Sequence, residues 1–375
     1  MSSLSKVALM ALSIAFSIVL FMTLDALILS KVIHTNQGDC YRKKPFGFYE
    51  LAENCIGKAG WGNVHYDIYT DQHGFRVGAP KTAFKPGKQR LNSILFVGDS
   101  YTFGINGPWK DTFVGMVGES LAAATVFNAG VTSYSPTPYV YALSKAYRNG
   151  IKPNAVIVSI DISDVQDEAA KWDMVDDMPR AIYELPPPPN SLTDTLDNTF
   201  PATSLIHHFL RDKVFGHETL KKDYVWNGDN KPVLNMARSA FTYTAAEKLE
   251  TCGFENLKCG YLPHGVAGGL QKIRTQMQRI SELAKVNNAK LYLLIYPWPA
   301  QLAYESSVVD WEEFIAGVCA GIRCDGVINA FPHFKEFKKN NLDWYEKLYV
   351  QGDMHYSVLG NRMVADEILL FLAKH

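Results

Sequence analysis

Residues 94–104 read ILFVGDSYTFG, and this stretch decides how the rest of the chain is interpreted. Its first four residues are apolar and include two β-branched side chains, which is typical of a strand buried in a parallel sheet. Gly98, Asp99 and Ser100 follow at once. Because open α/β sheets bind ligands beyond the carboxyl ends of their strands, Ser100 is expected at the functional edge. The alternative is that Asp99 or Ser100 only caps a turn or a helix, as both residue types often do.

Apolar runs and helical patterns alternate on both sides of this stretch. The runs predict buried strands, and apolar residues spaced three and four apart predict helices that cover both faces of a sheet. The predicted strands are 94–97, 125–127, 155–160 and 290–296, and the predicted helices are 111–124, 138–148, 270–286, 310–320 and 358–372. The fold class is therefore α/β: a three-layer α/β/α sandwich with a mainly parallel, flavodoxin-like sheet.

The N-terminal segment is the most apolar part of the chain. Residues 7–24 carry no charge, and with residues 26–29 they come close to spanning a ~30 Å hydrocarbon layer at about 1.5 Å per helical residue. The run exceeds the roughly 7–15 apolar residues of a cleavable signal, which favours an uncleaved signal anchor over a removed leader. We therefore predict a transmembrane helix within residues 1–33.

The remaining residues divide by composition. Residues 34–90 are polar and rich in Gly and Lys, with an alternating stretch at 65–69, and are interpreted as an extracytoplasmic extension packed on the main domain. Residues 91–375 form that main domain. Within it, residues 172–269 break the rhythm with four consecutive prolines and Asp- and Asn-rich turns, and are interpreted as an insertion.

The cysteines indicate the compartment. Six cysteines form three close pairs, and none has the C-x-x-C spacing of zinc or redox sites. An even, locally grouped set is typical of an oxidising compartment, with reduced thiols in a cytosolic core as the alternative. The predicted disulfides are Cys40–Cys55, Cys252–Cys259 and Cys319–Cys324. Flanking charges leave the orientation of the N-terminal helix open, so the placement rests on the cysteines. They predict that the body lies outside the cytoplasm, which is the periplasm if the cell is Gram-negative.

Charge and motif content exclude several classes of partner. Lys and Arg total 37 against 38 Asp and Glu, a formal charge of -1, so no global field attracts nucleic acid, and no nucleic-acid partner is expected. The sequence contains no P-loop, G-x-G-x-x-G or H-E-x-x-H motif. The acidic group Asp173, Asp176 and Asp177 is interpreted as a solvated loop. We therefore expect no cofactor and no metal.

A candidate base lies near the C-terminus, in residues 351–368, QGDMHYSVLGNRMVADEI. A serine becomes a nucleophile only if a base takes its proton, and the usual base is a histidine oriented by an acid. Asp353 and His355 are two residues apart at a predicted loop-to-helix boundary, and in an extended segment both side chains point to one side. A histidine is more often a surface or capping residue, but the neighbouring acid and the following helix start distinguish His355.

Four ordered blocks of sequence resemble the SGNH, or GDSL-type, hydrolase superfamily. They are residues 98–104 (GDSYTFG), 127–136 (FNAGVTSYSP), 158–168 (VSIDISDVQDE) and 352–357 (GDMHYS). The likeness covers about residues 70–375 and begins with 71–76 (DQHGFR), which is similar to the segment entering the first strand in many bacterial members. Four blocks in order are far more specific than any one of them.

The resemblance implies a role for each matching residue. It implies the nucleophile at Ser100, the catalytic histidine at His355, the acid at Asp353, and oxyanion donors at the backbone N–H groups of Ser100 and Gly130. The acid lies two residues before the histidine, where the family commonly has three. This D-x-H spacing resembles the branch that includes periplasmic alginate O-acetylation proteins.

The third block departs from the family pattern. Ser163 stands where the family usually has an asparagine that completes the oxyanion hole. A serine hydroxyl is shorter, and Asp161 and Asp164 would compete for its proton, so a hole with two backbone donors is favoured. Asn128 is interpreted as a structural turn residue rather than a replacement for that donor.

Three tryptophans are weaker candidates for a sugar-binding surface. Trp298 follows a strand end, and Trp172 and Trp226 lie in or beside the predicted insertion. Each could stack on a sugar ring, but packing is the commoner role of such a residue.

Together, the residues and the resemblance predict a membrane-anchored, extracytoplasmic serine esterase. It would remove acyl, chiefly acetyl, groups from an envelope or extracellular carbohydrate, or act on a small ester. The first alternative is an O-acyltransferase that moves acetyl to a glycan hydroxyl, since the same acyl-enzyme serves both reactions, and it could use a membrane-bound acyl-donor partner. The second is a catalytically silent domain that binds glycan or scaffolds an envelope complex.

Overall fold

A computed structural model describes residues 3–27, 40–61, 64–80, 92–121, 123–182, 261, 263–303 and 309–375. The chain divides into two units. Of the described residues, the smaller unit holds the N-terminal helix and Lys58–His65, and the larger holds the rest. The predicted pair Cys252–Cys259, Trp226 and most of the predicted insertion lie outside the described residues.

The smaller unit contains helix α1 (Ser3–Leu27), at the position of the predicted N-terminal helix. Large apolar side chains on it, Leu12 and Phe16 among them, are exposed. Among the residues that the structure describes, no helix has both the length and the apolar character needed to cross a membrane.

The main sheet has a parallel part and an antiparallel part. Strands β12, β11, β8, β6 and β7 lie next to one another in this order, and each pair runs parallel. Strands β5, β4 and β3 continue the order beyond β7, and β5 runs antiparallel to both β7 and β4. The bounds are β12 (Gly326–Asn329), β11 (Lys290–Ile295), β8 (Ala155–Ser159), β6 (Asn92–Val97), β7 (Ala124–Asn128), β5 (Arg76–Val77), β4 (Val64–Thr70) and β3 (Ile56–Trp61). The mainly parallel α/β sheet that the sequence predicts is confirmed.

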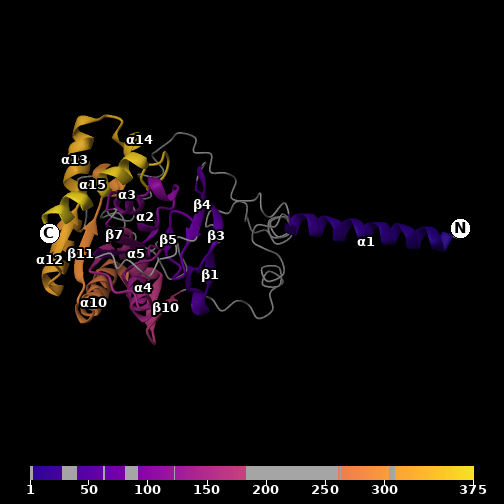
Figure 1. Cartoon of the computed structure of the whole chain (residues 1–375), viewed down its shortest axis with the longest axis horizontal. Coiled ribbons are helices and arrows are strands. Elements are labelled where there is room, and N and C mark those ends of the chain that lie inside the picture. The colour runs from indigo at the N-terminus through magenta and orange to yellow at the C-terminus, as the bar shows by residue number, and fades with distance from the viewer. Residues whose placement is uncertain are drawn as a thin grey trace. The chain divides into compact units, whose positions relative to one another are not determined.

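Helices cover both faces of this sheet, as Figure 1 shows. On one face lie α3 (Phe113–Ser120), α13 (Phe331–Asn340), α14 (Trp344–Leu348) and α15 (Val358–Lys374), and on the other lie α4 (Pro136–Arg148), α5 (Ser163–Ala170), α10 (Gly265–Val286) and α12 (Trp311–Ile322). Short helices complete the described set: α2 (Ser100–Phe103), α11 (Pro299–Ala303), and the 3-10 helices η2 (Pro45–Gly47) and η3 (Trp109–Asp111). Strands β6, β8 and β11 are buried almost throughout, which explains their continuous apolar runs.

One predicted helix is wrong at both ends. The prediction ran over 111–124, whereas α3 is confined to Phe113–Ser120. Thr112 caps it, because its hydroxyl accepts the Gly115 N–H at 3.0 Å, and Asp111 belongs to η3. Ala124 opens β7 and pairs with Asn92 of β6.

The residues before β6 contribute strands of their own. Strands β1 (Tyr41–Lys43) and β2 (Tyr49–Leu51) pair antiparallel, and the predicted alternating stretch lies in β4. The predicted disulfide Cys40–Cys55 is present, with Cα atoms 5.7 Å apart. The predicted pair Cys319–Cys324 is present as well and lies at the C-terminal end of α12, with Cα atoms 5.0 Å apart.

The predicted insertion begins as a hairpin of β9 (Trp172–Val175) and β10 (Met178–Ala181). Asp176 and Asp177 form its turn with φ of 49° and 61°, the left-handed pair that a type I′ turn requires. Helix α10 begins at Gly265, so the last residues assigned to the insertion are helical.

Candidate active site

Ser100 is presented by a tight connection from strand to helix. Strand β6 ends at Val97, and Ser100 is the first residue of α2. Asp99 caps this helix, because its Oδ1 accepts the Tyr101 N–H at 3.0 Å. The capping role that the sequence left open therefore belongs to Asp99, while the Ser100 hydroxyl faces another partner.

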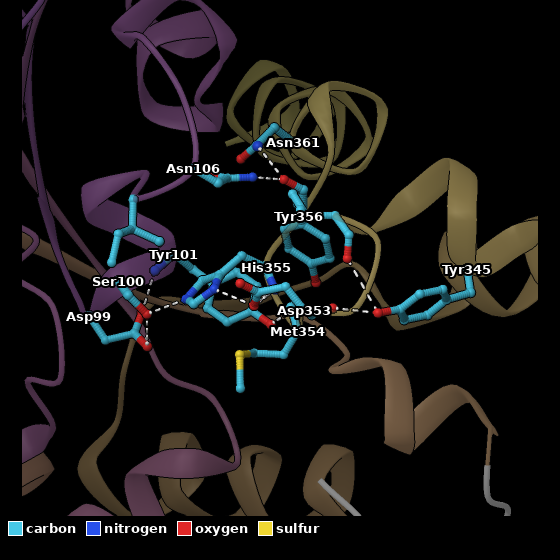
Figure 2. Close-up of polar contacts among 12 residues, drawn as sticks. Asp99, Ser100, Tyr101, Asn106, Tyr345, Asp353, Met354, His355, Tyr356 and Asn361 are labelled. Atoms are coloured by element: carbon cyan, nitrogen blue, oxygen red, sulfur yellow. Dashed lines mark hydrogen bonds and ion pairs between the residues drawn. The ribbon is translucent and has the colours of Figure 1, made fainter. Parts of the chain in front are cut away.

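That partner is His355, which lies 255 positions further along the chain. Figure 2 shows Ser100, His355 and Asp353 in one hydrogen-bonded line. Ser100 Oγ is 2.8 Å from His355 Nε2, and His355 Nδ1 is 2.8 Å from Asp353 Oδ1. A carboxylate can only accept here, so Nδ1 carries the proton and Nε2 presents its lone pair to the serine hydroxyl. Asp353 is 3% exposed and His355 6%, which shields the contact between them from water.

Backbone contacts hold the loop that carries Asp353 and His355. The His355 N–H donates to Asp353 Oδ1 at 3.0 Å, so one carboxylate oxygen binds both the backbone and the ring of the histidine. The Val350 N–H donates to His355 O at 2.8 Å, and the hydroxyl of Tyr345, on α14, donates to Asp353 O at 2.8 Å. The predicted D-x-H pair thus points to one side, in a loop fixed on both flanks.

Tyr101 joins the nucleophile helix to the histidine loop. Its ring centroid is 4.9 Å from that of His355, and its hydroxyl donates to Met354 O. Because Tyr101 follows Ser100 directly, α2 supplies both the serine hydroxyl and an aromatic ring that packs against the imidazole.

Asp99 is the buried acid beside the nucleophile. Its Oδ2 lies 3.3 Å from Ser100 Oγ, which makes His355, at 2.8 Å, the closer acceptor for the serine proton. Burial, and after it the charge of Asp161, raises the pKa of Asp99 well above its usual range. The neutral form that this favours adds no negative charge next to Ser100 Oγ.

Ser163 and Gly130, the two predicted oxyanion residues of the later blocks, both have hydrogen-bond partners. The Ser163 hydroxyl donates to Asp161 Oδ1 at 2.6 Å, and the Ser163 N–H donates to the same oxygen at 2.8 Å. The Gly130 N–H donates to Asn128 Oδ1 at 2.9 Å. The Ser163 proton is therefore bound to Asp161. Asn128 is the last residue of β7 rather than a turn residue, and its side chain has the structural role of binding the Gly130 N–H.

Gly130 also allows the segment after β7 to approach helix α2 closely. A Cβ at this position would lie 2.5 Å from Phe103 N and 2.8 Å from the Thr102 carbonyl carbon. Asn128 fastens the same contact, since its Nδ2 donates to Thr102 O at 2.8 Å. The second block is thus packed directly against the nucleophile helix.

The remaining candidates from the sequence are placed as follows. Trp172 is fully buried and donates its indole N–H to Ser133 O at 3.0 Å, so it is a packing residue. Trp298 is half-buried, with its ring 6.1 Å from that of Tyr101. Asp173 pairs with Lys272 at 2.7 Å. Among the described residues, no cluster of His, Cys, Asp and Glu is arranged to hold a metal ion.

Two residues around the site were not singled out from the sequence. Arg76 contacts the loop that follows α2, and Asn106, in that loop, donates to Tyr356 O beside the histidine. Arg76 stands in the quoted DQHGFR stretch, so the resemblance contained a signal for it. Asn106 carries no comparable signal, because its partner is 250 positions away.

A serine hydroxyl bonded to a histidine that an aspartate orients is the arrangement found in serine hydrolases. No protein-family model and no curated protein matches the sequence.

Similar solved structures include LAE5, an alpha/beta hydrolase enzyme from the metagenome of Lake Arreo, at 11% identity and a TM-score of 0.39, covering 74% of this chain and 94% of that one. A putative lipolytic protein of the G-D-S-L family from Desulfitobacterium hafniense has 12% identity, a TM-score of 0.38 and coverages of 74% and 97%. A catalytic mutant of Axe2, an acetylxylan esterase from Geobacillus stearothermophilus, has 13% identity and a TM-score of 0.37, and the match covers 74% of this chain and 93% of that one. At these TM-scores the likeness does not indicate what this chain does; the geometry of Ser100, His355 and Asp353 carries that inference.

Proposed function

We propose that this chain is an SGNH-type serine esterase that removes acyl, chiefly acetyl, groups from a carbohydrate. The observation that carries the proposal is the line from Ser100 Oγ through His355 to Asp353, with 2.8 Å at each hydrogen bond. A silent, purely binding domain would not require a buried acid, an oriented imidazole and a half-buried serine in contact.

The proposed first half-reaction forms an acyl-enzyme. Ser100 Oγ attacks the carbonyl carbon of the ester while its proton moves to His355 Nε2, and Asp353 stabilises the imidazolium. When the tetrahedral intermediate collapses, the bond to the alcohol oxygen breaks and His355 returns the proton to that oxygen. The alcohol leaves, and the acyl group stays on Ser100.

The proposed second half-reaction decides between esterase and transferase. Water, or a glycan hydroxyl, loses a proton to His355 and attacks the acyl carbon, and Ser100 regains the proton as the new acid or ester departs. The same residues serve both acceptors. The O-acyltransferase therefore remains the alternative, and a membrane-bound acyl donor would be its partner.

The proposed oxyanion hole is sparse. The Ser100 N–H would donate to the oxyanion, and the Gly130 N–H would do so by sharing its proton with Asn128 Oδ1, its present acceptor. The Ser163 hydroxyl is given to Asp161. Because each missing donor typically costs about 10²–10³ in turnover, we expect a slow or specialised enzyme.

We also propose that the larger unit lies outside the cytoplasm and that α1 associates with a membrane. Two disulfides support the first part, since structural disulfides persist in oxidising compartments. Mapping of non-reduced peptides from the native host should find Cys40–Cys55, Cys319–Cys324 and the predicted Cys252–Cys259 linked. Free thiols at all six positions would contradict the placement.

Recovery of the chain in the salt-washed membrane fraction tests the proposed association of α1 with a membrane.

Hydrolysis of p-nitrophenyl acetate by the purified full chain tests the proposed activity. We expect p-nitrophenol release by the wild type and none above background by Ser100→Ala, with equal melting temperatures as the control for folding. Addition of a sugar acceptor separates the alternatives. A rate indifferent to the acceptor supports the esterase, a rate that rises with it supports the transferase, and the absence of release from p-nitrophenyl acetate by a folded wild type contradicts both.

A further inference from the structure

Arg76 is a buried cation with an unusual set of partners. Arg76 lies in β5 and is only 1% exposed. Within the described part of the chain it forms no ion pair with a carboxylate. Its Nη1 donates to the carbonyl oxygens of Phe103 and Gly104, both at 2.5 Å, and its Nη2 donates to Gly107 O at 2.6 Å. These three hydrogen bonds of the guanidinium end on the last residue of α2 and on the loop that follows it.

Burying this cation is costly. A charge without an opposite charge loses its hydration, and hydrogen bonds to carbonyl oxygens recover only part of that loss. The rings of Phe103 and Tyr66 recover more, since Arg76 Cζ lies 4.7 Å and 5.2 Å from their centroids. An apolar side chain would fill the space at a lower desolvation cost. The arginine therefore contributes a fixed geometry, because its planar guanidinium holds the carbonyls that it binds in set positions.

The loop that Arg76 binds begins at the end of the nucleophile helix. Helix α2 has four residues, Ser100–Phe103, and Gly104 ends it in the left-handed conformation with φ of 80°. A helix of one turn has little rigidity of its own, so the carbonyls at its end need external partners. Arg76 binds two of them, and the hydroxyl of Tyr66, on β4, donates to Ile105 O.

The same loop reaches the histidine. Asn106 lies between Ile105, whose carbonyl accepts from Tyr66, and Gly107, whose carbonyl accepts from Arg76. Its Nδ2 donates to the carbonyl oxygen of Tyr356, the residue after His355. Figure 2 shows this contact above the line from Ser100 to Asp353. One loop is thus joined to α2 at one end, to the histidine segment through Asn106, and to the antiparallel strands through Arg76.

We propose that Arg76 is a positioning residue that sets the Ser100–His355 distance through the 103–107 loop. The proposal rests on the proposed function, in which that distance governs attack on the ester. A shift of about 1 Å between reacting groups can cost about 10²-fold in rate without weakening ground-state binding, so the effect should fall on kcat and leave KM nearly unchanged.

Two substitutions of Arg76 in the full chain test this role. Arg76→Met removes all donors, and Arg76→Lys keeps the charge but replaces the fork by a single ammonium. With p-nitrophenyl acetate we expect kcat to fall about 10²-fold in Arg76→Met and about 10-fold in Arg76→Lys, with KM within about twofold of wild type. The rate at which a fluorophosphonate labels Ser100 should fall by similar factors.

Lys145→Met provides the matched control. Lys145, on α4, forms an ion pair with Glu50 of β2 at 2.9 Å, so its loss loosens the same N-terminal region without touching the 103–107 loop. We expect a lower melting temperature and unchanged kcat and KM. This separates positioning from a general loss of stability.

The outcomes distinguish this proposal from the proposed function. If both Arg76 variants fold and keep wild-type kcat, or if their loss appears in KM alone, the positioning role is wrong while the esterase stands. If neither folds, Arg76 belongs to the fold and not to the alignment of Ser100, which also contradicts the proposal. An inactive wild type with no serine labelling would overturn the proposed function itself.

Discussion

The parallel and antiparallel parts of the main sheet contribute different things to the site. The parallel part presents Ser100 at the end of β6, and the segment that carries Asp353 and His355 follows its edge strand β12 along the chain. The antiparallel part supplies no group to the line of hydrogen bonds, but Arg76 and Tyr66 on β5 and β4 bind the loop after the nucleophile. We therefore assign the proposed chemistry to one part of the sheet and the proposed alignment to the other, and substitutions can test each part by itself.

The largest effect is expected from removal of the nucleophile. Ser100→Ala should lower turnover by at least about 10³-fold, because it removes the hydroxyl that lies 2.8 Å from His355 Nε2. The folded variant should keep the wild-type melting temperature, since the change deletes one half-buried oxygen. Activity above a few per cent of wild type would place the chemistry elsewhere.

A second large effect is expected at the acid. Asp353→Asn keeps the shape of the side chain but can donate to His355 Nδ1, which would favour the tautomer that turns a proton toward Ser100. We expect kcat to fall by about 10³-fold with little change in KM. Steady-state kinetics on Asp353→Asn and the wild type check this. A loss of kcat below about tenfold would mean that Asp353 does not set the tautomer of His355.

A smaller effect is expected in the antiparallel part. Tyr66→Phe removes the hydrogen bond to Ile105 O and keeps the ring beside Arg76, so Arg76 still holds the loop. We expect kcat to fall by about threefold to tenfold, well below the loss in Arg76→Met. An equal loss in both variants would mean that the ring stack and the hydroxyl, rather than the guanidinium fork, align the loop.

Almost no effect on turnover is expected at Ser163. Its hydroxyl donates to Asp161 Oδ1 at 2.6 Å, so Ser163→Ala should leave kcat within about threefold of wild type. Ser163→Asn tests the other direction, since an amide that reached the oxyanion would raise kcat. A loss of about 10²-fold in Ser163→Ala, with KM unchanged, would restore the hydroxyl as a third oxyanion donor.

The smallest effect on catalysis, with a clear effect on stability, is expected at Asp167. Burial raises the pKa of Asp167 to about 6, although the positive charge of Lys171 acts to lower it. Between about pH 4 and pH 6 the folded chain then holds a proton that the unfolded chain has lost, so this group makes the free energy of unfolding fall as the pH rises.

Asp167→Asn should therefore flatten the dependence of the free energy of unfolding on pH in this window and leave kcat unchanged. Denaturant unfolding at a series of pH values measures it. Asp343→Asn is the matched control, because Asp343 is exposed and the pKa of its carboxyl is lowered by Lys347. If the free energy of unfolding depends on pH in the same way in the wild type and in Asp167→Asn, the raised pKa of Asp167 is contradicted.

The two parts of the sheet also differ in what the sequence reveals. Strands β6, β8 and β11 are predictable because burial on both faces requires continuous apolar runs. Strand β5 has two residues and β12 has four, bounded by Gly326 and Asn329, so neither leaves a periodic signal. Strand β4 alternates as a strand should, but nothing local to it indicates which strand it pairs with.

The site divides in the same way. Ser100, Asp353 and His355 could be predicted because each stands in a short motif whose chemistry is local. The contacts around them could not, since Arg76 lies 27 positions from Phe103 and Asn106 lies 250 positions from Tyr356. The occupied N–H of Gly130 was equally hidden, because it depends on the rotamer of Asn128.

Covalent labelling tests the central claim most directly. The purified full chain is treated with a fluorophosphonate and the adduct is located by peptide mass mapping, beside His355→Ala as the control that removes the base. We predict one adduct per chain on Ser100, formed at least about 10²-fold more slowly in His355→Ala. An adduct on another residue, or a Ser100 adduct that forms equally fast without His355, would contradict it.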